Sequence, residues 1–154
     1  MNAYFLDSSA LVKRYVAETG TLWVQALVAP STRHKLLITR ITWVEVLSAL
    51  ARRQRDGSLS SAQVDGSVRS FRYDLGTQYQ VIEFSRELAE TAGQLVRKHP
   101  LRAYDAVQLA SALRVQLDLV QAQAPPLTFI CADDHLLAVA QAEGLRTDNP
   151  NQHL

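Results

Sequence analysis

Four carboxylates stand where apolar segments of this chain begin or end. Asp7 follows the run AYFL, Glu45 lies within ITRITWVEV, Asp105 opens YDAVQLASAL, and Asp133 follows LTFICA. A charge at the edge of a buried segment is costly unless something there uses it. Carboxylate oxygens are ligands that Mg²⁺ and Mn²⁺ prefer, and such ions assist phosphodiester hydrolysis by activating water and offsetting the charge of the phosphate. These residue types therefore favour a divalent metal site of a nuclease.

Each acid also has a structural interpretation. Thr42 and Glu45 match a capping box, in which the glutamate reaches back to the first helical amide. Asp133 suits an N-cap, and Asp105 suits the first turn of a helix. Asp7 is disfavoured in a strand but can start a turn. These interpretations do not explain why every predicted strand except the third is followed closely by an acid.

The elements around these acids are predicted from apolar runs and their spacing. Short apolar runs predict strands, and longer segments with helical spacing predict helices between them. Because parallel strands need crossover connections, this alternation favours an α/β fold, a three-layer α/β/α sandwich with a central, mostly parallel sheet. The predicted strands cover residues 3–6, 36–39, 81–84 and 127–131, and the predicted helices start near residues 8, 21, 42, 60, 85, 101 and 133.

A parallel sheet would bring the four acids together. Ligands of such sheets bind outside the carboxyl ends of the strands. Asp7 and Asp133 each follow a predicted strand, whereas Glu45 and Asp105 lie near the start of predicted helices. We therefore expect all four side chains at one edge of the sheet.

Composition limits the class of protein. The 154 residues, 47% of them hydrophobic, predict one domain over residues 1–154, with a loose polar tail from about residue 148. The formal net charge is only +1, so nucleic-acid binding would need a local basic patch. The single cysteine, Cys131, excludes an internal disulfide and a cysteine-based zinc site. We see no leader peptide and no apolar run of about 18 residues, and therefore predict a cytoplasmic protein outside the membrane.

Four segments resemble one family. YFLDSSALVKRY, ITWVEVLSALAR, YDAVQLASAL and FICADDHLLAVAQAEGL resemble PIN-domain ribonucleases, specifically the VapC-type toxins of bacterial toxin–antitoxin pairs. The order and spacing of these segments agree with the family over nearly the whole chain. The resemblance implies a PIN-like fold, endonucleolytic hydrolysis of RNA and dependence on Mg²⁺ or Mn²⁺.

The resemblance also assigns roles to residues. Asp7, Glu45, Asp105 and Asp133 take the family's acidic positions, and Ser9 takes the position of its supporting hydroxyl. We expect Asp7 and Asp105 to bind metal directly, Glu45 to bind it or to orient its water, and Asp133 to complete the site. A Ser or Thr often stands two residues before the last acid of the family, but here that residue is Cys131. Asp134 is an adjacent substitute for Asp133.

Three arginines are predicted to contact RNA phosphates. Arg40 ends the second predicted strand, and Arg102 closely precedes Asp105. Arg52 follows Glu45 by about two helical turns and should share its helix face. The alternative is a set of solvated surface arginines, which we prefer for Arg53 and Arg55.

Partners are predicted from the family and from apolar residues. The resemblance implies a VapB-type antitoxin and a homodimer. We expect the apolar residues of the first half to exceed what one small core covers, and exposed apolar patches mark interfaces. We therefore predict a groove for an antitoxin helix, with ordinary burial as the alternative. The residues concerned are Leu11, Tyr15, Trp23, Leu27, Trp43 and Leu50.

Other functions are weaker alternatives. The chain would also suit a PIN-domain nuclease of RNA processing or turnover without an antitoxin, or an inactive PIN-like binding module. An aspartyl phosphotransferase is disfavoured, because Ser9 stands where such phosphatases place a second acid. Trp23 and Trp43 could stack on bases, although burial is preferred. The histidines, including His135 beside Asp134, are expected to be exposed and not catalytic.

Overall fold

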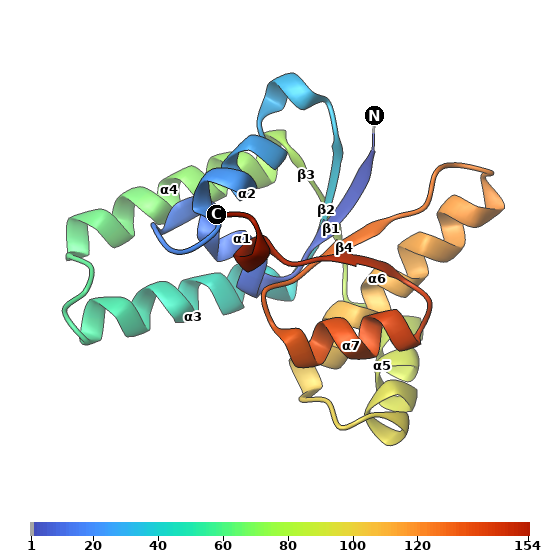
Figure 1. Ribbon diagram of the computed structural model, residues 1–154. Coiled ribbons are helices and arrows are strands. Elements are labelled where there is room, and N and C mark those ends of the chain that lie inside the picture. The colour runs from blue at the N-terminus through green and yellow to red at the C-terminus, as the bar shows by residue number, and fades with distance from the viewer. Residues whose placement is uncertain (1) are drawn as a thin grey trace.

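Five parallel strands form the centre of the molecule. The computed structural model describes residues 2–154, and in it the strands stand in the order β3-β2-β1-β4-β5 (Figure 1). Every neighbouring pair is parallel. The predicted α/β sandwich is therefore confirmed, with a sheet that is wholly parallel. The strands are β1 Ala3–Leu6, β2 Lys35–Thr39, β3 Tyr79–Ile82, β4 Thr128–Ile130 and β5 Arg146–Asp148.

Helices cover both faces of this sheet. One hydrophobic cluster joins the sheet to the first four helices, and a second cluster joins it to the last three. The two groups lie on opposite sides of the strands in Figure 1. The first group comprises α1 Ser8–Tyr15, α2 Thr21–Leu27, α3 Ile41–Arg55 and α4 Ser61–Thr77, with the short 3-10 helix η1 Pro30–Thr32. The second group comprises α5 Arg86–Lys98, α6 Ala103–Gln121 and α7 Asp134–Ala142.

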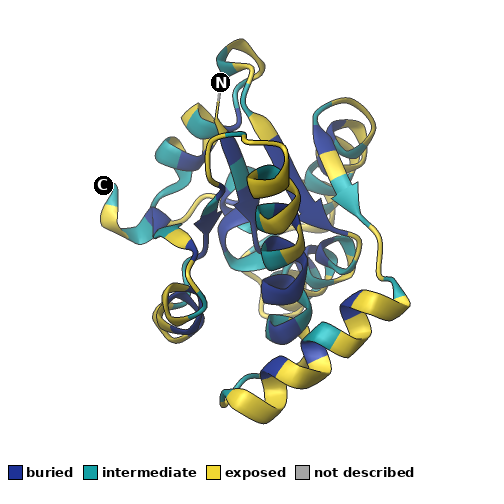
Figure 2. Cartoon of the chain, turned by 90° about the vertical axis from the view of Figure 1, so that its right-hand side faces the viewer, coloured by how far each residue is buried: buried dark blue, intermediate teal, exposed yellow. Residues whose placement is uncertain are grey.

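Strand geometry explains the two clusters. Successive side chains of a strand point to opposite faces of the sheet. Phe5 therefore packs with α5, α6 and α7, while its neighbour Leu6 packs with the first four helices. In β4 the same division separates Phe129 from Ile130, and the rings of Phe5 and Phe129 stack with centroids 5.8 Å apart. Figure 2 shows the buried residues gathered on the strands and on the inward faces of the helices.

The third strand begins earlier than the sequence predicts. The prediction covered residues 81–84, but β3 runs from Tyr79 to Ile82. Tyr79 is buried and pairs with Leu36 in the register of β2, whereas Phe84 is 56% exposed. The apolar run alone misplaced this strand because its last aromatic residue faces solvent.

The end of the chain is packed, contrary to the predicted loose tail. The strand β5 was not predicted, since Arg146-Thr147-Asp148 has no apolar residue. It is followed by the 3-10 helix η2, Pro150–Gln152, whose N-cap Asn149 is buried. The His153 ring stacks on Trp23 of α2 with centroids 4.2 Å apart. Polar groups thus hold the tail in place through hydrogen bonds and stacking, which hydrophobic patterning does not reveal. No helix among the described residues is long and apolar enough to cross a bilayer.

Candidate active site

A cleft of about 1030 Å³ contains all four predicted acids. Its walls are α1 and α3, and it is bordered by the starts of α6 and α7. Asp7 follows β1 and Asp133 follows β4, which are adjacent parallel strands. Asp133 and Asp7 therefore lie at the same edge of the sheet, although they are far apart in the sequence. The expected convergence at the carboxyl edge of the sheet is what the structure shows.

Asp7 is buried at the N-terminus of α1. It is the N-cap of this helix, and its Oδ1 accepts hydrogen bonds from the amide of Ala10 at 3.0 Å and from Oγ of Ser9 at 2.7 Å. Ser9 Oγ in turn accepts from the amide of Ala132 at 2.9 Å, so this hydroxyl links the ends of β1 and β4. Burial raises the pKa of Asp7 from 3.8 to about 6, and nearby Glu45 adds to the rise.

Glu45 is held by a residue that the sequence analysis missed. The Nε2 group of Gln108, on α6, donates to Glu45 Oε1 at 2.8 Å and to Thr42 Oγ1 at 2.9 Å. The capping box is absent, because α3 has Arg40 as its N-cap and no side-chain cap. Burial raises the pKa of Glu45, while the hydrogen bond from Gln108 opposes this rise. A polar residue on the buried face of the apolar α6 was the available signal.

Asp105 and Asp133 each stand at the start of a helix and also line the cleft. Asp105 lies in the first turn of α6, with its Oδ2 3.8 Å from Nε of Arg102. Burial raises the pKa of Asp105; Arg102 opposes this rise, and Asp133 adds to it. Asp133 caps α7 by accepting from the amide of His135 at 2.9 Å. Its neighbour Asp134 does not line the cleft and accepts a hydrogen bond from Asn149 instead.

The donor set suits a hard divalent cation in its chemistry. In addition to burial, repulsion acts between successive pairs of these acids. Glu45 raises the pKa of Asp7, Asp105 raises the pKa of Glu45, and Asp133 raises the pKa of Asp105. A cation would relieve this repulsion. However, no three His, Cys, Asp or Glu side chains of residues 2–154 are grouped to hold one ion. The carboxylates fit such an ion by type, but they stand as a row and not as a closed cluster.

Comparison with known proteins identifies the family. The pattern of the PIN domain matches residues 4–123. The chain belongs to the PIN-domain family. The matched part of this PIN domain includes Asp7, Glu45 and Asp105 and ends before Asp133.

Individual relatives agree with this assignment. Ribonuclease VapC45 of Mycobacterium tuberculosis (strain CDC 1551 / Oshkosh) is 34% identical over 115 residues, which cover 75% of this chain and 78% of that protein. The structure of FitAB bound to the IR36 DNA fragment matches with a TM-score of 0.66 at 14% identity, covering 98% of this chain and 96% of the other. A toxin–antitoxin complex from Klebsiella pneumoniae matches with a TM-score of 0.62 at 20% identity, covering 96% and 97%. The two structures support the fold.

The predicted arginines divide into two groups in this PIN domain. Arg52 and Arg102 line the cleft, as expected. The prediction for Arg40 is wrong in position, because Arg40 lies outside the cleft and pairs with Glu83, which follows β3. Arg53, for which a surface position was preferred, is partly exposed, lines the cleft and forms an ion pair with Glu18 at 3.1 Å.

The predicted apolar groove is largely core. Leu11 and Leu50 are fully buried, and the partly buried Trp23 and Trp43 pack against the same hydrophobic cluster. Ordinary burial was therefore the correct alternative for these residues. Among residues 2–154, the large apolar side chains that are exposed are instead Leu22, Val44, Tyr73, Phe84, Val96, Tyr104, Leu117, Val120 and Leu154.

Two other side chains near the acids have structural contacts. His135 Nε2 lies 2.7 Å from the carbonyl oxygen of Pro100, which ties α7 to the loop before α6. Cys131 is fully buried, and its sulfur accepts a hydrogen bond from the amide of Asp133 at 3.3 Å. The sulfur also lies 3.7 Å from Ser9 Oγ. The cysteine thus replaces the hydroxyl of the family pattern as a contact of the loop that carries Asp133.

Proposed function

We propose that this chain is the ribonuclease toxin of a VapBC-type toxin–antitoxin pair and hydrolyses RNA internally at the acidic end of the cleft. The observation that carries this proposal is the row of four carboxylates, supplied by four separate elements, in a chain of the PIN-domain family. A relative that is 34% identical bears the name ribonuclease, which supports RNA as the substrate.

The proposed cofactor is Mg²⁺ or Mn²⁺. Asp7 and Asp105 would hold the ion directly, with Glu45 and Asp133 completing the site. When bound, such an ion lowers the pKa of water and offsets negative charge on a phosphate. Carboxylates are suitable ligands because both ions prefer oxygen donors.

The chain itself orients the acids. The hydroxyl of Ser9 and the amide of Ala10 both engage Oδ1 of Asp7, which fixes the direction of this carboxylate. The amide of Gln108 does the same for Glu45. Hydrogen-bond partners of a metal-ligating side chain set its orientation and its basicity. The carboxylates of Asp7 and Glu45 are therefore positioned before any substrate arrives.

RNA cleavage by the purified protein tests this proposal. Wild-type protein should cut RNA with Mg²⁺ or Mn²⁺ and not with EDTA. Asp7→Asn and Asp105→Asn should each reduce the rate by orders of magnitude, while Asp65→Asn, an exposed position on α4, should not. Full cleavage by both cleft variants would contradict the site, and binding of RNA without cleavage by wild type would favour a binding module.

The proposed partners are a VapB-type antitoxin and a second copy of the chain. Leu22 on α2 is 82% exposed and Val44 at the cleft is 64% exposed, so apolar surface remains for a partner to cover. Co-expression with an antitoxin should protect these positions from hydrogen exchange, and light scattering should give the mass of a dimer. A monomer that cuts RNA and binds no antitoxin would instead indicate a nuclease of RNA processing.

A further inference from the structure

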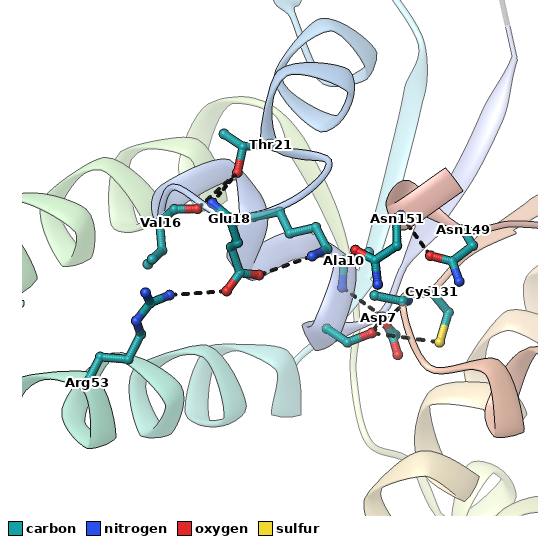
Figure 3. Close-up of polar contacts among 12 residues, drawn as sticks. Asp7, Ala10, Val16, Glu18, Thr21, Arg53, Cys131, Asn149 and Asn151 are labelled. Atoms are coloured by element: carbon teal, nitrogen blue, oxygen red, sulfur yellow. Dashed lines mark hydrogen bonds and ion pairs between the residues drawn. The ribbon is translucent and has the colours of Figure 1, made fainter. Parts of the chain in front are cut away.

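A second group of charges lies in the cleft beside the acids. Lys13 on α1 is only 5% exposed, and its Nζ lies 3.2 Å from Oε1 of Glu18. The other carboxylate oxygen of Glu18 lies 3.1 Å from Nη1 of Arg53, on α3 (Figure 3). Two cations thus share one carboxylate. Arg52 and Asp56 also line the cleft, and Asp56 interacts with Arg53, so three cations and two carboxylates here leave a net charge of +1. A buried lysine is costly unless an anion pairs with it.

The backbone that carries Glu18 is held in place. Thr21 Oγ1 accepts a hydrogen bond from the amide of Glu18 at 2.9 Å and donates to the carbonyl oxygen of Val16 at 3.1 Å. Figure 3 shows Glu18 between α1 and Arg53, reaching across the space between the two helices. The carboxylate therefore spans the cleft as an ordered bridge.

Both walls of the cleft carry their charges in the same order. On the α1 wall, Asp7 precedes Lys13 by six residues, about 9 Å along a helix axis. On the α3 wall, Glu45 precedes Arg53 by eight residues, about 12 Å. The cleft therefore has an acidic end, where carboxylates outnumber cations, and a basic end, where cations outnumber carboxylates. A strand of RNA that places one phosphate at the acids would bring other phosphates toward the cations.

We propose that Lys13 and Arg53 form a phosphate-binding subsite for the RNA backbone, which the carboxylate of Glu18 occupies in the free protein. This inference rests on the proposed function, because RNA is taken as the ligand. A phosphate oxygen would replace the oxygens of Glu18 between the two cations. The competing interpretation is that the three side chains only tie α1 to α3, with cations near helix C-termini.

Binding without cleavage tests the subsite. The probe is a fluorescent, ribose-methylated, single-stranded RNA, and its anisotropy is measured in EDTA. Lys13→Met and Arg53→Ala should each weaken binding by about tenfold. Each should also make the negative slope of log affinity against log salt shallower by about 0.7, the value for one lost phosphate contact on a single strand. Glu18→Gln should tighten binding several-fold, because the competing anion is gone.

Matched variants separate this effect from bulk charge. Arg55→Ala removes an exposed arginine of the same helix outside the cleft, and Glu83→Gln removes a carboxylate that pairs elsewhere. Both should leave affinity within about twofold of wild type. Melting curves identify any variant that fails to fold, and Arg53→Ala, which replaces a partly exposed side chain, keeps the test valid if Lys13→Met unfolds.

Three outcomes overturn the subsite. One is wild-type affinity and salt slope in a folded Lys13→Met or Arg53→Ala protein. Another is weaker binding by Glu18→Gln, which would assign the bridge to structure. The last is the absence of RNA binding by wild type, which would also remove RNA as the ligand. In contrast, loss of cleavage in Asp7→Asn with intact RNA binding concerns the acidic end alone.

Discussion

Because Asp7 is buried, its ionised carboxylate destabilises the folded state near neutral pH. Its folded pKa of about 6 lies above the ordinary value of 3.8, so the folded state disfavours the ionised carboxylate. The destabilisation therefore appears as pH rises through 3.8, is complete above about 6, and is absent when the group is protonated in both states. The difference corresponds to about 3 kcal/mol of folding free energy at most.

The first prediction follows from this cost. In EDTA at pH 7, Asp7→Asn should melt at a higher temperature than wild type, by the equivalent of up to about 3 kcal/mol. Asparagine keeps the acceptor that caps α1, so little else is lost. The gain should shrink as the pH falls and disappear below about pH 3, where the carboxyl group is protonated in both states and thermal melts of the two proteins should coincide. A lower melting temperature at pH 7 would show that the charge of Asp7 stabilises the fold.

The second prediction concerns the amide that orients Glu45. Gln108→Met removes a hydrogen bond that lowers the pKa of Glu45, so this pKa should rise further above its ordinary value. An NMR titration of the carboxyl group would measure it, with Gln121→Met at the exposed end of α6 as the control. The free energy of unfolding should change little, because Oε1 of Gln108 is buried without a partner among the described residues. An unchanged pKa would limit Gln108 to a packing role.

At the scale of elements, Gly20, the N-cap of α2, packs closely against Pro150 in η2. Its φ of +86° is left-handed, and a Cβ placed there would lie 2.5 Å from the carbonyl oxygen of Pro150 in η2. Gly57 has a similar φ of +85° with no atom near a Cβ. The two glycines therefore share a left-handed backbone but differ in the contact that an added Cβ would make.

The third prediction uses this pair of glycines. Gly57→Ala should lower the free energy of unfolding by about 1–2 kcal/mol, the cost of a left-handed backbone with a side chain. Gly20→Ala should cost clearly more, because η2 must also move. Denaturant unfolding at constant m-value measures both variants. Equal losses would mean that η2 yields freely to the new methyl group.

Sequence spacing predicted the helices and strands better than it predicted where long side chains point. The strands next to the site, β1 and β4, and the acids that follow them were predicted because apolar runs and topology determine both. The strand β5 was missed because it has no apolar residue. Glu45 was placed at the cleft, but its partner Gln108 comes from a distant helix that no local pattern connects to it. The ion pairs of Arg40 with Glu83 and of Arg53 with Glu18 were not predicted, because backbone position does not determine which carboxylate a flexible guanidinium contacts.

At the scale of the whole molecule, metal binding is linked to global stability. A ligand that binds only the folded state raises the melting temperature by an amount that grows with its concentration. The fourth prediction is that Mg²⁺ or Mn²⁺ raises the melting temperature of wild type, and that this rise shrinks in Asp105→Asn. Asp65→Asn should respond as wild type does. A full response in Asp105→Asn would place the ion elsewhere.

The position of β1 in the sheet has a consequence for the synthesis of the protein. β1 pairs on one side with β2 and on the other with β4, and the amide of Asp7 donates to the carbonyl oxygen of Ile130 at 3.1 Å. β1 is therefore synthesised long before β4, one of its two neighbours in the sheet. A chain interrupted before residue 128 has β2 but lacks β4, the other strand that pairs with β1. It also lacks the backbone contact of Asp7 with Ile130, and Asp133 itself. Translation must therefore pass Asp133 before the acidic end of the cleft is complete.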